Sequence, residues 1–158
     1  MLSHGTVNTV LREIASLSMR LGFLGAMFGV LAACSTPPSG LSGMGLPQQR
    51  ANEVYPGTRM ALEGVLQIAD DGCFQLLMNG NRTFVIWPPG ASQDGPVRIR
   101  LPDGGVIGEG DALKATGAFT PVAPLIADRN GYWATTIGFC APESEEVIVL
   151  DSASRVAG

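Results

Sequence analysis

Chemically versatile side chains are scarce in this 158-residue chain, which has one histidine, one lysine and three cysteines. The histidine, His4, precedes an apolar run that we interpret below as a removable targeting signal. Without His4 the chain cannot form a Ser-His-Asp or Cys-His arrangement, nor a histidine-based zinc or iron site. Lys114 falls in a predicted strand, where we expect a solvated charge rather than a Schiff-base nucleophile. We therefore predict no catalytic residue, no metal site and no cofactor, in a protein that is not an enzyme.

Positive charge is scarce as well. Lysine and arginine total 10 against 14 aspartate and glutamate residues, which gives a formal net charge of −4. An acidic chain repels phosphate backbones, and Arg98 and Arg100 are too few to form a basic patch. A GxxxxGK[ST] phosphate-binding loop is also lacking. We expect no nucleic-acid partner.

Carboxylates are the remaining groups suited to acid–base chemistry. Several stand next to glycine, as in Asp103-Gly104 and Glu109-Gly110-Asp111, and such pairs are typical of turns. Two carboxylates facing one another across a cleft would support an alternative interpretation, a carboxylate-dependent hydrolase. The candidates are Asp70, Asp71, Asp103, Glu109, Asp111 and Asp128.

A long apolar run is confined to the N-terminal region. Leu21–Leu31 carries no charge, spans 11 residues and follows Arg20. This length suits the apolar core of a secretory signal, about 7–15 residues, and falls short of the roughly 20 residues that a transmembrane helix needs. The run therefore predicts a signal segment, disordered or helical, rather than a membrane span.

The run ends in Leu31-Ala32-Ala33-Cys34, which resembles the lipobox of bacterial lipoproteins. The resemblance implies that the Cys34 thiol carries a diacylglycerol and that a signal peptide, residues 1–33, is cut off just before it. Two or more acyl chains anchor a protein stably to a membrane. We thus expect a protein that is lipid-anchored through Cys34 to a bacterial membrane and exposed outside the cytoplasm, with an envelope protein or glycan as the kind of partner. Translation from Met19 is an alternative start, and a buried helix with a chance cysteine is the alternative interpretation of the run.

The mature chain divides by composition into a tether and a domain. Residues 34–58 are rich in Ser, Gly, Pro and Gln, and predict a lipidated flexible tether. Part of Gln48–Tyr55 is open to an alternative, a short helical turn against the domain. We expect the β domain over residues 59–153 and a short tail over 154–158.

Short apolar runs bounded by turn residues predict an all-β domain. Asn79-Gly80 between two such runs is a strong hairpin signal, because both residues tolerate positive φ. The stretch Gly108–Phe119 resembles the turn and curved strand of OB-fold barrels, with Gly117 where a barrel bends. We therefore predict a small five- to six-stranded OB-like barrel. Seven runs are strand candidates, of which five or six would form the barrel: 60–69, 73–78, 82–87, 97–101, 112–119, 132–140 and 146–152.

Cys73 and Cys140 form an even pair once Cys34 is assigned to the lipid. Outside the cytoplasm such a pair favours a disulfide bond, and two buried thiols are the alternative. Aromatic residues make up 6% of the chain. Trp87, Tyr132 and Trp133 are candidates for a ligand-binding face that stacks sugars or bases, or alternatively for core packing.

These features together predict a membrane-anchored lipoprotein whose small, non-enzymatic β domain has a binding or structural role in the cell envelope. A carboxylate-dependent envelope hydrolase and an OB-type module that binds oligosaccharides or peptides are the alternatives.

Overall fold

The computed structural model describes residues 45–156. The predicted signal over residues 1–33, the lipidation site Cys34 and the tether up to residue 44 lie outside this range. No helix within it is long and apolar enough to cross a membrane. The elements are β1 (Met60–Ile68), β2 (Phe74–Met78), β3 (Asn81–Ile86), β4 (Ser92–Gln93), β5 (Arg98–Arg100), β6 (Val106–Gly108), β7 (Ala112–Pro121), α2 (Val122–Leu125), α3 (Tyr132–Cys140) and β8 (Glu146–Arg155).

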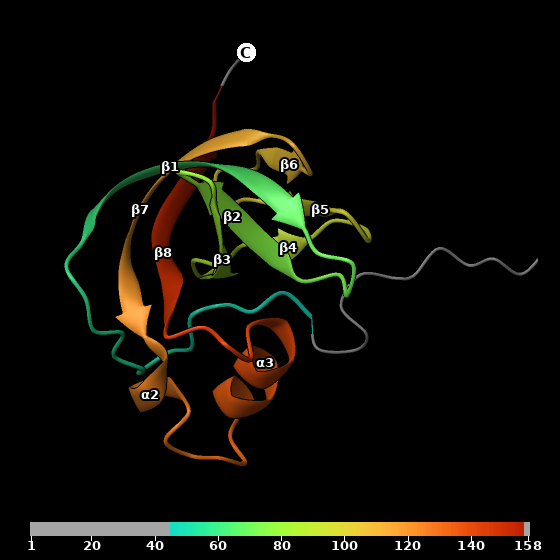
Figure 1. Cartoon of the computed structure of the whole chain (residues 1–158). Coiled ribbons are helices and arrows are strands. Elements are labelled where there is room, and N and C mark those ends of the chain that lie inside the picture. Colours follow the sequence, from blue (N-terminus) through green and yellow to red (C-terminus); the bar gives the residue numbers. More distant parts are fainter. Residues whose placement is uncertain (1–44, 157–158) are drawn as a thin grey trace, which may run out of the picture. The chain divides into compact units, whose positions relative to one another are not determined.

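Five strands close into a barrel in the order β1-β2-β3-β8-β7, with β7 pairing back onto β1 (Figure 1). All pairs are antiparallel except β3 with β8. Closure removes the free strand edges that would otherwise invite association. The interior is filled by alternating apolar side chains of the strands, as small barrels require. The predicted all-β, OB-like barrel is confirmed.

The hairpin between β2 and β3 turns at Asn79 and Gly80, which have φ values of 50° and 83°. Met78 pairs directly with Asn81, so the loop has two residues. Positive φ at both positions matches the right-handed twist of the strands. The predicted Asn-Gly hairpin is confirmed.

Strand β7 bends at Gly117, where its register with β8 shifts between Thr116 and Gly117. A Cβ atom at Gly117 would lie 2.4 Å from the carbonyl oxygen of Val149, so only glycine fits this close approach. The sequence correctly places a glycine at a bend of the barrel.

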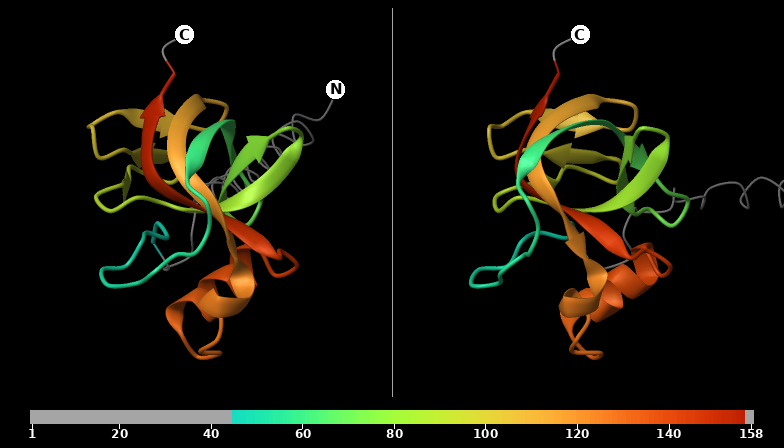
Figure 2. Two further views of the ribbon diagram at one scale, coloured as in Figure 1. Left: turned by 90° about the vertical axis from the view of Figure 1, so that its left-hand side faces the viewer. Right: turned by 60° about the vertical axis from the view of Figure 1, so that its left-hand side comes forward.

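Between β3 and β7 the chain forms a separate three-stranded sheet in the order β4-β5-β6, beside the barrel (Figure 2). Ile99, Leu101 and Ile107 are buried there. The sequence predicts the β5 region, because Val97, Ile99 and Leu101 alternate, but not the short strands β4 and β6. Those strands are too short to show the alternation of apolar and polar residues that identifies a strand in a sequence.

The predicted strand over residues 132–140 is wrong, because this segment is the helix α3. Its aromatic and β-branched residues favour a strand locally. In the fold, however, Trp133, Thr136, Ile137 and Cys140 follow the i, i+3, i+4, i+7 spacing of one helix face and are buried. Packing against the end of the barrel overrides the local preference.

The predicted tether is wrong for its last part, because residues 46–58 lie against the domain. Leu46 and Tyr55 are buried, and Gln48 pairs with Trp87 in a parallel bridge. Backbone hydrogen bonds from Trp87 N–H to Pro47 O and from Gln49 N–H to Trp87 O add this segment beyond the end of β3. Within it, Arg50–Glu53 forms a β-turn rather than the helical turn considered above. The folded domain therefore begins near Leu46 instead of residue 59.

Strand β8 also extends further than expected. It runs to Arg155, whose backbone pairs with Leu113 and whose guanidinium lies 2.7 Å from Asp111. The predicted tail from residue 154 thus begins later, because β8 continues along the full length of β7.

A disulfide bond joins Cys73, just before β2, to Cys140, the last residue of α3 (Cα–Cα 5.6 Å). Both cysteines are buried. The predicted pairing is confirmed, although Cys140 lies at the end of a helix rather than of a strand. The bond fixes the C-terminal end of α3 to the barrel.

Replacing Cys73 and Cys140 together with alanine should lower the free energy of unfolding by about 4 kcal/mol, because the bond closes a long loop in the unfolded chain. Urea denaturation of the oxidised protein and the double variant measures the difference. The matched control is Cys34→Ala, which should leave the unfolding midpoint unchanged. Identical midpoints for the double variant and the parent would contradict the structural role of the bond.

Gly117→Ala should lower the free energy of unfolding by about 1–3 kcal/mol, because the added Cβ overlaps the Val149 carbonyl. Gly108→Ala is the control, since its Cβ would meet atoms only at an ordinary 3.5 Å. Thermal unfolding of both variants tests the prediction, and equal effects would refute it.

Candidate functional site

The two helices lie together at one end of the barrel, opposite the end from which β8 leaves toward the C-terminus (Figures 1 and 2). Helix α3 has two apolar faces. One face, around Trp133 and Cys140, packs on the barrel. The second face lies next to the first and shares Ile137 with it; it carries Ala134 and Gly138, continues in Ala141 just after the helix, and turns toward α2.

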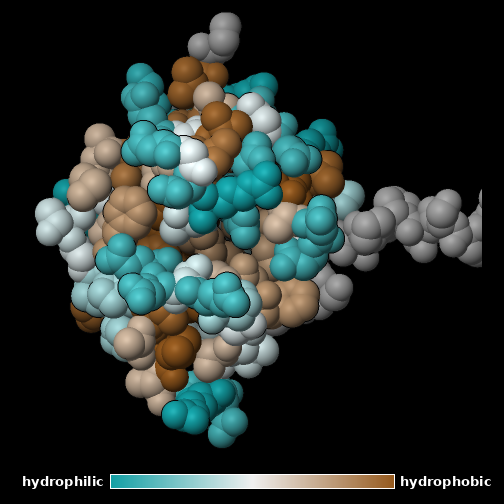
Figure 3. Space-filling model, in the orientation of Figure 1, coloured by the Kyte–Doolittle hydropathy of each residue, from teal (hydrophilic) through white to brown (hydrophobic). Residues whose placement is uncertain are grey.

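The second face lines an open groove of about 530 Å³, which we call the α2–α3 groove. Its other wall is formed by α2 and the residues just after it: Val122, Ala123, Ile126 and Ala127. Pro142 and Arg129 complete the lining. In Figure 3 apolar surface gathers at this helical end, bordered by the hydrophilic loop between the helices. The groove is thus lined by apolar side chains and one charged side chain, while a large part of its exposed lining surface is polar.

Arg129 differs from most cations of the described region. Arg50, Arg59, Arg98, Arg100, Lys114 and Arg155 each lie within 4.0 Å of a carboxylate. Within residues 45–156, Arg129 and Arg82 have no such partner, and only Arg129 lines the groove. The guanidinium at the groove is therefore available to an anion.

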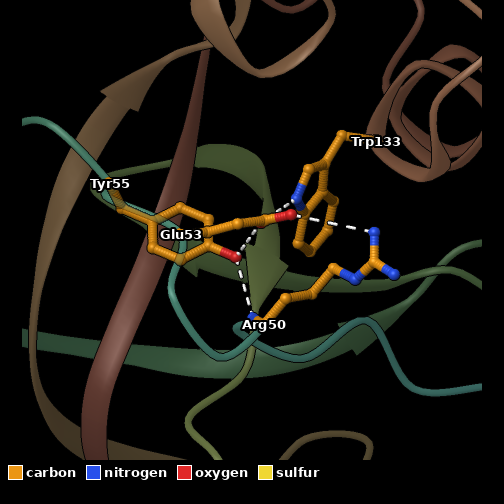
Figure 4. Close-up of polar contacts among 4 residues, drawn as sticks. All are labelled: Arg50, Glu53, Tyr55 and Trp133. Atoms are coloured by element: carbon orange, nitrogen blue, oxygen red, sulfur yellow. Dashed lines mark hydrogen bonds and ion pairs between the residues drawn. The ribbon is translucent and has the colours of Figure 1, made fainter. Parts of the chain in front are cut away.

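The N-terminal end of α3 is held by a group that we call the Glu53 cluster, formed by Arg50, Glu53, Tyr55 and Trp133 (Figure 4). Glu53 Oε2 accepts hydrogen bonds from the Tyr55 hydroxyl (2.6 Å) and from Trp133 Nε1 (2.5 Å). Glu53 Oε1 lies 3.7 Å from the Arg50 guanidinium, and the Arg50 N–H donates to the Tyr55 oxygen (2.9 Å). The cluster clamps residues 50–55 onto α3.

Burial, and next the hydrogen bond to Glu53, raise the pKa of Tyr55 to about 12. Because this pKa lies above the ordinary value near 10, the fold favours the neutral phenol. The stability from this preference is complete below about pH 10 and is lost as the pH rises through about 12.

The three aromatic candidates do not form a common exposed face. Trp87 is fully buried, and its Nε1 has no hydrogen-bond partner within the described residues. Trp133 is buried and donates a hydrogen bond to Glu53. Neither indole therefore presents a surface on which a ligand could stack. Tyr132 is half-buried, with its ring edge-on to Trp133 and beneath the Arg50 guanidinium.

Four of the six candidate carboxylates cap backbone N–H groups of their own turns. Asp71, Asp103, Asp111 and Asp128 accept from Cys73, Gly105, Gly108 and Asn130, respectively. The Gly108 N–H, with Arg155, holds the pKa of Asp111 below its usual value. This is the turn chemistry expected of acid-glycine pairs. Among residues 45–156, no three His, Cys, Asp or Glu side chains gather to hold a metal ion.

Comparison of the chain with family models, curated proteins and solved structures finds no match. The candidate site is therefore defined by geometry alone. Sequence reasoning missed the groove, because it assigned α3 to a strand. The available signal was the small-residue spacing of Ala134, Gly138 and Ala141, which shares a face only in a helix.

In Glu53→Gln, the pKa of Tyr55 should fall below the native value of about 12, because the negative charge that disfavours the phenolate is removed. An ultraviolet absorbance titration of the phenolate measures this pKa. Tyr55→Phe assigns the signal, since it should abolish the high-pH transition. An unchanged transition in Glu53→Gln would show that the carboxylate does not act on Tyr55.

Proposed function

We propose that this chain is a lipid-anchored domain outside the cytoplasm of a bacterium, with a binding role at the envelope. The observation that carries the location is the Cys73–Cys140 disulfide. Disulfide bonds persist in oxidising compartments, and this one leaves Cys34 as the third cysteine, at the end of the lipobox-like Leu31-Ala32-Ala33-Cys34.

The α2–α3 groove favours a binding role over a purely structural one. It is concave and lined by apolar side chains with one free cation, a combination found in small-molecule sites. The proposal includes no enzymatic activity. Removal of residues 1–33 takes away the single histidine, and four of the candidate carboxylates are engaged in turns.

Docking of residues 46–58 onto the barrel shortens the proposed tether. Eleven residues separate Cys34 from Leu46, and so short a segment spans at most about 40 Å when fully extended. The anchor would thus hold the domain close to the membrane surface.

Cys34→Ala should abolish lipid labelling and leave residues 1–33 uncleaved, because it removes the thiol that would receive the diacylglycerol. The full chain is expressed in a bacterial host with an alkyne-tagged fatty acid, and the label and the mass of the chain are compared between parent and variant. The Cys73→Ala/Cys140→Ala variant is the matched control and should keep its label. A Cys34→Ala chain that is still cleaved and labelled would refute the anchor.

A further inference from the structure

We infer that the α2–α3 groove binds a medium-chain fatty acid, with the acyl chain between the two helices and the carboxylate at Arg129. This inference names the ligand for the proposed binding role and rests on that role. It does not depend on the lipid anchor, because the groove belongs wholly to the folded domain.

The size of the groove selects a small ligand. Its volume of about 530 Å³ lies within the range of roughly 300–1,000 Å³ typical of small-molecule sites.

Small residues keep the groove open. Ala134 and Gly138 are one helical turn apart on α3, and a Cβ atom added at Gly138 would meet no atom within 4 Å. The wall that carries them is fixed at both ends, by the Glu53 cluster at Trp133 and by the disulfide at Cys140. A wall fixed before binding reduces the entropy that a ligand must offset.

The charge of the groove selects the head group. Arg129 is its single charged lining residue, and a guanidinium can pair with a carboxylate through two parallel hydrogen bonds. The neighbouring acidic residues, Asp128 before Arg129 and Glu143 after Pro142, do not line the groove. They disfavour a dianionic phosphate more strongly than a monoanionic carboxylate, because like-charge repulsion grows with the charge of the ligand.

Calorimetric titration of the purified full chain carrying Cys34→Ala, which has no acyl group at residue 34, tests the inference. Dodecanoate, below its micellar concentration, should bind with one-to-one stoichiometry. Dodecanol should bind about two- to fivefold more weakly, the effect expected of an exposed ion pair. Propanoate, which has the charge without the chain, should not bind measurably.

Gly138→Leu should weaken dodecanoate binding by about tenfold or more, because the new side chain displaces ligand methylenes from apolar contact. Its fold should be retained, since the added atoms enter open space and leucine is a better helix former than glycine. Thr135→Leu is the matched control. It places the same side chain at an exposed position of α3 that does not line the groove, and it should bind as the parent does.

Arg129→Gln should bring dodecanoate affinity down to that of dodecanol, and Arg82→Gln, which alters the other unpaired cation, should not. Equal binding of dodecanoate to the parent and Gly138→Leu, equal binding of dodecanoate and dodecanol to the parent, or association with lipid vesicles only would each overturn the inference. Lipid labelling at Cys34 without dodecanoate binding would remove this ligand and leave the anchor intact. Dodecanoate binding without lipid labelling at Cys34 would refute the anchor and leave this ligand intact.

Discussion

The attachment of α3 to the barrel is the constraint on which the helical end of the molecule depends. A nine-residue helix without a side-chain cap is too short to persist alone in water. It is held at its C-terminal end by Cys73 and at its N-terminal end by Glu53, partners 67 and 80 residues away in the sequence. Both contacts hold the barrel-facing side of α3 in place, and the adjoining side, which begins at the shared residue Ile137, forms the groove wall.

The Glu53 carboxylate holds the segment 46–58 against the domain, as the disulfide holds α3 against the barrel. It accepts hydrogen bonds from two side chains in different segments of the chain, the Tyr55 hydroxyl and the Trp133 indole N–H. A charged acceptor forms stronger hydrogen bonds than a neutral one, and both donors would be costly to bury without it. A segment rich in turn-forming residues thereby becomes an ordered part of the domain.

The sequence predicts most of the barrel because its signals there are local. Asn79-Gly80 defines a hairpin, and Gly117 marks a bend, by their own backbone freedom. The helix α3 and the segment 46–58 are missed because their structure depends on distant partners. Trp133 and Tyr55 acquire their positions from one carboxylate, and nothing in the sequence near Glu53 indicates that role. The cysteine pair is the exception, because assigning Cys34 to the lipid leaves Cys73 and Cys140 as the remaining pair.

Strand β8 contributes to two sides of the barrel, pairing with β7 along its length and with β3 in parallel. It is also the last element in the part of the chain that the structure describes. Until residues 146–155 have been synthesised, β3 and β7 each present an unpaired edge, and such edges are templates for association with other chains. The growing polypeptide therefore carries the unpaired β3 edge while residues 87–145 are synthesised and the unpaired β7 edge while residues 122–145 are synthesised, and protection of both edges becomes a requirement of this topology.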